Sequence, residues 1–122
     1  MERRVPNALP IMEQTIDALC QFYCFDGSGN LMSSVGSNKK DLLVHWCHGA
    51  PGWILLLIQA SKVFSKPSYL ELAKKTAEWT LWTRGLREKG LGLCPGIAGN
   101  GFVFLRLSHA LEGEEQRAER HF

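Results

Sequence analysis

The sequence contains no apolar run long enough to cross a membrane. Its longest uninterrupted apolar segment, Trp53 to Ile58, is far short of the ~20 residues that a bilayer-spanning helix requires. The N-terminal segment MERRVPNALPIM also lacks the apolar core of a secretory signal. Together these absences predict a cytoplasmic protein without a transmembrane segment.

The chain also has little excess charge of either sign. It carries 14 Lys and Arg residues against 12 Asp and Glu residues, which gives a formal net charge of +2. The basic residues are scattered along the chain and form no stripe that could follow a phosphate backbone. Nucleic acid is therefore excluded as an expected partner.

Alternation of apolar and polar residues, which marks half-buried strands, is missing as well. Apolar residues instead recur at three- and four-residue spacing, which is typical of amphipathic helices. We expect helices over residues 10–23, 51–64 and 68–83, a fourth helix after the glycine-rich segment, and a polar loop over 26–41. The predicted fold class is all-α, and the polar residues from Glu112 onward are expected to fray.

Four cysteines are present, and without an export signal their thiols are expected to be reduced. Cys20 and Cys24 lie four residues apart, and the apolar face of the first helix predicts that they are core residues and not a chelating pair. The tryptophans are expected to pack within the helical core; they are Trp46, Trp53, Trp79 and Trp82.

An internal repeat is the most informative feature of the sequence. The segments WCHGAPGWILLLIQA and LCPGIAGNGFVFLRL superpose without gaps at an offset of 47 residues. The aligned pairs are Cys47 with Cys94, Gly49 with Gly96, and Gly52 with Gly99. Each unit is a glycine-containing loop, an apolar helix and a further helix where the chain continues. A period of this length is typical of arrays in which neighbouring helical hairpins stack to bury their apolar faces.

The repeat predicts that Cys47 and Cys94 point toward one shared place at the starts of two helices. A helix N-terminus lowers the pKa of a thiol and so favours the thiolate. Two adjacent thiolates repel each other unless a cation lies between them, and zinc is the cation that suits sulfur ligands without redox chemistry of its own.

The histidines beside the first cysteine suggest an alternative, in which Cys47 is a nucleophile and His45 or His48 its base. Residues so close in sequence rarely place an imidazole in line with the sulfur, and such partners usually come from distant segments. We therefore favour the metal hypothesis over a cysteine-protease-like site.

Three segments together resemble the lanthionine synthetase C-like (LanC-like) family, eukaryotic type. They are LVHWCHGAPG, RGLREKG and GLCPGIAGNGFVFL, and the resemblance covers about residues 16–111 of a single partial domain spanning 1–122, with a polar tail over 112–122. The family fold is an α/α toroid of seven helical hairpins around a zinc ion held by two cysteines and a histidine. The resemblance implies the C-terminal portion of such a toroid, roughly two to three of its seven repeats.

The resemblance also assigns residues to the expected site. Cys47 and Cys94 match the two zinc cysteines, and Lys89 matches a lysine that contacts glutathione in eukaryotic members. The third zinc ligand of the family is a histidine, but Pro95 stands at that position here. His48 is the nearest substitute in sequence, although the family does not use that histidine as a ligand.

Two functions follow from the resemblance. The first is zinc-dependent addition of glutathione to dehydroalanine or dehydrobutyrine residues in peptides or proteins, impaired here by the loss of the third ligand. The second is a catalytically inactive truncated helical repeat that binds glutathione or a protein, including a second copy of itself, through faces that further hairpins would cover.

Overall fold

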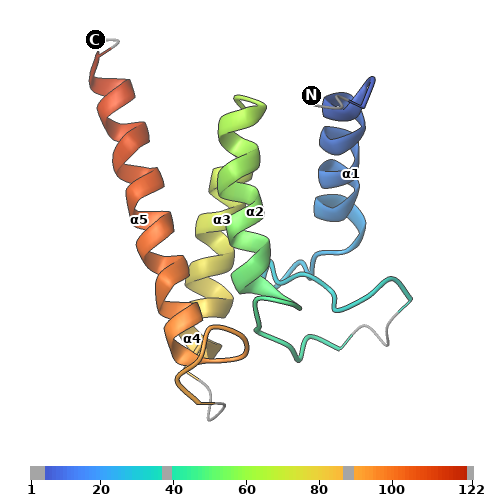
Figure 1. Cartoon of the computed structure of the whole chain (residues 1–122), viewed down its shortest axis with the longest axis vertical. Coiled ribbons are helices and arrows are strands. Elements are labelled where there is room, and N and C mark those ends of the chain that lie inside the picture. The colour runs from blue at the N-terminus through green and yellow to red at the C-terminus, as the bar shows by residue number, and fades with distance from the viewer. Residues whose placement is uncertain (1–4, 37–39, 87–89, 121–122) are drawn as a thin grey trace.

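The computed structural model describes residues 5–36, 40–86 and 90–120, and within these ranges it contains helices and loops but no strand. Figure 1 shows the helices standing side by side, with both ends of the chain at the same side. The elements are α1 (Ala8–Phe22), α2 (Ala50–Val63), α3 (Pro67–Thr76), η1 (Ala77–Leu81), α4 (Trp82–Arg84) and α5 (Ile97–Arg120). The all-α prediction is confirmed.

Helix α2 lies at the centre of the packing. It contacts α3, η1 and α5, and in Figure 1 α2 and α5 run in the same direction. A helix with neighbours on several sides is apolar around most of its circumference. The largest fully buried side chains come from these elements and from the loop before α2: Val44, Trp53, Ile54, Leu57, Leu70, Leu81 and Val103.

The expected helix over 68–83 is interrupted by the π-helical turn η1. The buried positions recur at three- and four-residue spacing from α3 through this turn, and they define a face that does not include Trp79 or Trp82. Thr80 and Leu81 are buried, whereas Trp79 is 50% exposed and Trp82 is 75% exposed. The prediction that these two tryptophans pack in the core is therefore wrong.

The polar C-terminal segment is helical and does not fray as expected. Helix α5 continues through Glu112 to Arg120, although the residues beyond Leu111 are exposed. This segment is rich in Glu, Gln, Arg and Ala, which are strong helix formers. Opposite charges three residues apart, as at Glu114 and Arg117, favour the helix further.

Helix α1 is attached through one polar cluster and a small apolar contact. The Asp17 carboxylate accepts hydrogen bonds from Lys66 Nζ at 2.8 Å and from Tyr69 Oη at 2.6 Å. The Lys66 hydrogen bond, followed by that from Tyr69, lowers the pKa of Asp17. Burial, followed by the Asp17 hydrogen bond, raises the pKa of Tyr69 to about 12. The cluster fixes α1 to the start of α3.

The sequence repeat is also a repeat in the structure. Helix α2 begins at Ala50 and α5 begins 47 residues later at Ile97. Their first turns form equivalent hydrogen bonds, from Trp53 N to the Gly49 carbonyl at 3.2 Å and from Asn100 N to the Gly96 carbonyl at 3.3 Å. The two motif segments therefore enter their helices in the same way.

Glycine makes this helix start possible. A methyl group at Gly52 would overlap the carbonyl oxygen of Trp46, and one at Gly99 would overlap the carbonyl oxygen of Leu93. Trp46 and Leu93 are themselves equivalent positions, each directly before a cysteine. The backbone that carries each cysteine thus rests against the first turn of the helix that follows it, at a distance only glycine permits.

We expect Gly52→Ala to destabilise the fold by about 1–3 kcal/mol, because the added methyl group must displace the Trp46 backbone. Gly101→Ala is the matched control, since that glycine is exposed on α5 and nothing lies within 4 Å of the added atom. Alanine favours a helix interior over glycine by up to about 1 kcal/mol, so the control should gain stability. Urea unfolding followed by circular dichroism measures both, and equal effects would contradict the close-packing interpretation.

Candidate metal centre

Cys47 and Cys94 each lie three residues before a helix, at the starts of α2 and α5. Both thiols are exposed. The two thiols are near enough for each to shift the pKa of the other, although 47 residues separate them in sequence. The structure thus brings together the two residues that the repeat aligns.

The two thiols differ in their proton affinity. The neighbouring Cys94 thiol, followed by partial desolvation, raises the pKa of Cys47. The neighbouring Cys47, through its thiol and its backbone N–H, together with the backbone N–H of Trp46, lowers the pKa of Cys94. The sequence predicts a lowered pKa for both thiols, but the interaction between them lowers the pKa of only one.

Trp46 ties the two motif segments together. Its indole Nε1 donates a hydrogen bond to the Gly99 carbonyl at 3.0 Å, and its ring lies 5.9 Å from the ring of Phe102. The sequence predicts a packing role for this tryptophan but gives no sign of the hydrogen bond across the repeat. Because Trp46 precedes Cys47 directly, this bond fixes the first cysteine relative to α5.

No third ligand accompanies the two thiols in the part of the chain that the structure describes. His48 is exposed, and only its backbone N–H is directed at the Cys47 sulfur. Pro95, which is also exposed, has no side-chain donor. Over residues 5–36, 40–86 and 90–120 no group of three or more His, Cys, Asp or Glu residues is arranged to hold a metal ion. Lys89, the predicted glutathione contact, lies outside the described residues.

Cys20 and Cys24 lie in a more buried environment than Cys47 and Cys94. Both are half-buried and pack against the hydrophobic core. Burial, together with the nearby Cys20, raises the pKa of Cys24 to about 12, although the neighbouring Trp53 indole acts to lower it. Burial also raises the pKa of Cys20. The expectation that these two are core residues agrees with this packing.

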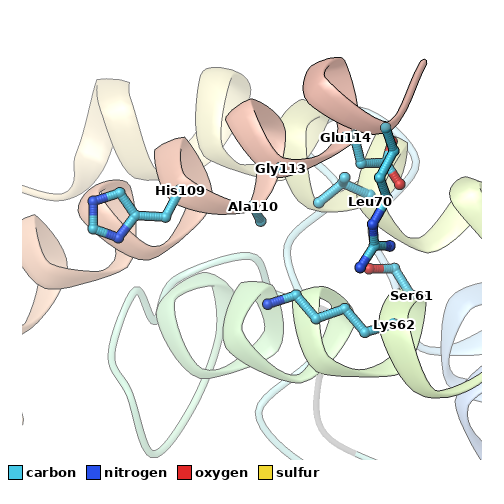
Figure 2. Close-up of a pocket in the computed structure, with 8 residues that line it drawn as sticks. Ser61, Lys62, Leu70, His109, Ala110, Gly113 and Glu114 are labelled. Carbon is cyan, nitrogen blue, oxygen red and sulfur yellow. The ribbon is translucent and has the colours of Figure 1, made fainter. Parts of the chain in front are cut away.

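A cavity of about 140 Å³ lies far from the thiol pair, between the C-terminal halves of α2 and α5. Figure 2 shows Ser61 and Lys62 of α2 across this cavity from His109 and Ala110 of α5. Its walls contain no cysteine. The thiol pair is therefore an open surface site at the opposite end of these helices.

The profile of the family described as lanthionine synthetase C-like protein matches residues 2–122. The chain belongs to this family. It is 48% identical over 97 residues to glutathione S-transferase LANCL1 of Danio rerio. This match covers 80% of this chain and 23% of that protein. It is 42% identical over 96 residues to LanC-like protein GCL1 of Arabidopsis thaliana, covering 79% of this chain and 22% of that protein. The chain thus spans less than a quarter of the length of these relatives.

Membership of the LanC-like family agrees with the helical fold, which corresponds to part of a helical toroid. Proteins of this family generally bind zinc. The thiols of Cys47 and Cys94 fit two positions of such a site, because neighbouring soft sulfur donors are suitable zinc ligands. Pro95 leaves the third position without a donor, so the described residues do not complete a zinc centre.

A polar network holds the loop that leads to Cys47. The Asp41 carboxylate accepts hydrogen bonds from Asn30 Nδ2 at 2.7 Å and Arg84 Nη1 at 2.8 Å, and a third from Ser28 Oγ. Arg84 Nη2 donates to the Asp41 carbonyl at 2.8 Å. Burial alone would raise the pKa of Asp41, but the hydrogen bonds from Asn30, Ser28 and Arg84 outweigh it and lower that pKa. Sequence patterns identified this segment only as a polar loop.

Asp41→Asn should destabilise the chain at neutral pH by about 1–2 kcal/mol, since Arg84 loses its charged acceptor. The folded-state pKa of Asp41 is lowered, so its contribution is complete above the unfolded value of ~3.9 and disappears as the pH falls through the lowered value. The variant should therefore lose stability less steeply than wild type below about pH 4. Urea unfolding at several pH values checks this, with Glu71→Gln on the exposed face of α3 as control. Parallel pH curves for wild type and Asp41→Asn would contradict it.

Within the described residues, no helix is both long and apolar enough to span a membrane.

Proposed function

We propose that this chain supplies the two thiolate ligands of a LanC-like zinc centre, at which glutathione is added to dehydroalanine or dehydrobutyrine residues of a peptide or protein. The observation that carries the proposal is that Cys47 and Cys94 lie three residues before two equivalent helices, whose motif segments are joined by the bond from Trp46 to the Gly99 carbonyl. The printed name of the Danio rerio relative, a glutathione S-transferase, supports glutathione as the thiol.

The reaction is an addition that needs no leaving group. The glutathione sulfur bonds to the β-carbon of the dehydroamino acid, the carbon–carbon π bond breaks, and the α-carbon takes up a proton from water. A bound zinc ion would lower the pKa of a thiol that coordinates it and so supply the nucleophile at neutral pH.

The residues of this chain would position the ligands and stabilise a thiolate before any substrate binds. Trp46 holds the two motif segments in register through its bond to the Gly99 carbonyl. The backbone N–H groups of Trp46 and Cys47 favour the thiolate of Cys94, which is the form that binds a metal. Lys89 is proposed as the contact for a glutathione carboxylate.

Without a third donor, the proposed site is expected to bind zinc more weakly. Two thiolates and no imidazole hold zinc less tightly than the three-ligand set of the family, so we propose that activity is impaired. His48 is the nearest imidazole, but it would have to turn toward the sulfurs, because in the structure only its backbone is directed at Cys47.

A second candidate function is supported by the exposed apolar side chains beside α4 and α5. Trp82 is 75% exposed and Leu86 is 83% exposed, and both line an apolar hollow together with Phe104. Such a surface is typical of a protein contact. In this alternative the chain is an inactive helical module that binds another polypeptide.

The variant Pro95→His tests the metal centre directly. Changes to residues that only support a metal ligand alter affinity by about 10–100-fold, so restoring a direct ligand should tighten zinc binding by at least about tenfold. Competition with a chromophoric chelator measures zinc affinity, and the sulfur-to-cobalt absorption of the cobalt-loaded chain reports the number of thiolates.

Matched controls separate the thiol pair from the other cysteines. Cys47→Ser and Cys94→Ser should each abolish cobalt–thiolate absorption, whereas Cys20→Ser should leave it unchanged. If Pro95→His binds zinc no better than wild type while its helicity is normal, the two cysteines do not share a metal site.

Activity is tested with glutathione and a dehydroalanine peptide, followed by mass spectrometry of the thioether product. We expect a slow zinc-dependent rate for wild type, a faster one for Pro95→His, and only the uncatalysed background for Cys94→Ser. If the chain binds zinc but the addition of glutathione is no faster than the uncatalysed reaction, the inactive helical module is favoured over the enzyme hypothesis.

A further inference from the structure

The cavity between α2 and α5 gathers cationic side chains from both helices. Lys62 of α2 and Arg117 of α5 line it together with the imidazole of His109, and Glu114 is the only carboxylate that the described residues contribute to its walls. We propose that this cavity of about 140 Å³ binds a small phosphate-class oxyanion, either inorganic phosphate or the phosphate group of a small ester.

Small residues on α5 leave the space for this cavity. Ala110 and Gly113 line it from α5, and a methyl group added to Gly113 would meet no atom within 4 Å. Leu70 of α3, which is 2% exposed, forms part of an apolar inner wall. Figure 2 shows the Lys62 side chain between α2 and the part of α5 that carries His109 and Ala110. The volume admits a four-oxygen ion, since a water molecule occupies about 30 Å³ in the liquid.

The two full cations at the cavity have no partner within the part of the chain that the structure describes. Neither the Lys62 nor the Arg117 side chain forms an ion pair or a hydrogen bond there, and neither does His109. Lys66, by contrast, is paired with Asp17 at the start of α3. Unpaired cations around one hollow attract an anion, and the apolar inner wall reduces the screening of that attraction by water.

A phosphate group suits this set of donors better than a carboxylate ligand does. It carries a charge of about −1.5 to −2 at neutral pH, which corresponds to two cations and not to one. The Arg117 guanidinium can donate two parallel hydrogen bonds to phosphate oxygens. The Lys62 ammonium adds a compact positive charge, and a ring nitrogen of His109 can donate a further hydrogen bond.

Only one full negative charge in the walls opposes an anion. The C-terminal end of a helix carries partial negative charge on its carbonyl groups, but at this end of α2 carbonyl groups are hydrogen-bonded. Ser61 Oγ donates to the Ile58 carbonyl at 2.7 Å, and Lys66 N donates to the Ser61 carbonyl at 3.1 Å. Glu114 remains unpaired and repels an anion. Its removal should therefore tighten binding, which is the opposite of the effect of removing a cation.

Titration of the isotope-labelled chain with sodium phosphate at constant ionic strength, followed by NMR, tests the site. We expect saturable shifts of the backbone amide signals of the residues that line the cavity. Lys62→Gln and Arg117→Gln should each weaken phosphate binding by about two- to fivefold, the range typical of exposed ion pairs. Glu114→Gln should tighten phosphate binding by a similar factor.

Lys40→Gln is the matched control. Lys40 is exposed in the loop before α2, so this variant loses the same charge outside the cavity and should bind phosphate like wild type. Circular dichroism shows whether each variant is folded. A second titration with glycerol 3-phosphate distinguishes the two sources of the phosphate group. Tighter binding than that of inorganic phosphate supports an ester as the ligand, and equal or weaker binding supports the free ion.

Three results would overturn the phosphate site. They are amide shifts that do not saturate, acetate that binds as tightly as phosphate, and equal weakening in Lys40→Gln and Lys62→Gln, because the effect would then follow net charge alone. The site does not depend on the proposed zinc centre. Cys47→Ser, which removes a proposed zinc ligand, should bind phosphate like wild type, so either proposal can fail while the other stands.

Discussion

Two glycines packed against backbone carbonyls determine where the thiols lie. Gly52 meets the Trp46 carbonyl and Gly99 meets the Leu93 carbonyl, so the residue before each cysteine rests on the first turn of the helix that follows. Each cysteine is then three residues from a rigid helix start. The bond from Trp46 to the Gly99 carbonyl joins the two assemblies. The proximity of the two cysteines therefore follows from backbone packing and from the hydrogen bond of one indole.

The repeat makes the backbone around the two cysteines alike, but the thiols differ chemically. Backbone N–H groups of Trp46 and Cys47 act on Cys94, whose pKa is lowered, whereas the neighbouring Cys94 thiol raises the pKa of Cys47. Two adjacent thiolates would repel each other, and a cation between them would relieve that repulsion. In the proposed zinc centre, Pro95 stands where the family has its third ligand.

The sequence was sufficient to predict the helical fold class and the starts of the two repeated helices, because both depend on short-range patterns. Glycine and proline at fixed offsets mark the helix starts, and a gapless repeat aligns Cys47 with Cys94. The sequence was insufficient where distant contacts decide the outcome. Contacts with α2 bury the face of α3 and η1 that carries Ala73, Ala77 and Leu81, so Trp79 and Trp82 were placed wrongly. Two further features join segments that lie far apart in the sequence: the bond between Trp46 and Gly99, and the network around Asp41. No local sequence pattern indicates that these segments are close.

Apolar side chains remain exposed on both sides of this helical group. Ile11 on α1 is 57% exposed, and Trp82 and Leu86 beside α5 are 75% and 83% exposed. Relatives more than four times as long as the matched segment offer further helices that could cover such faces. The contacts that position Cys47 and Cys94 come from residues 46–102, where the two motif segments meet the starts of α2 and α5. Covering the apolar faces would therefore add stability, whereas the placement of the two cysteines already follows from contacts within this chain.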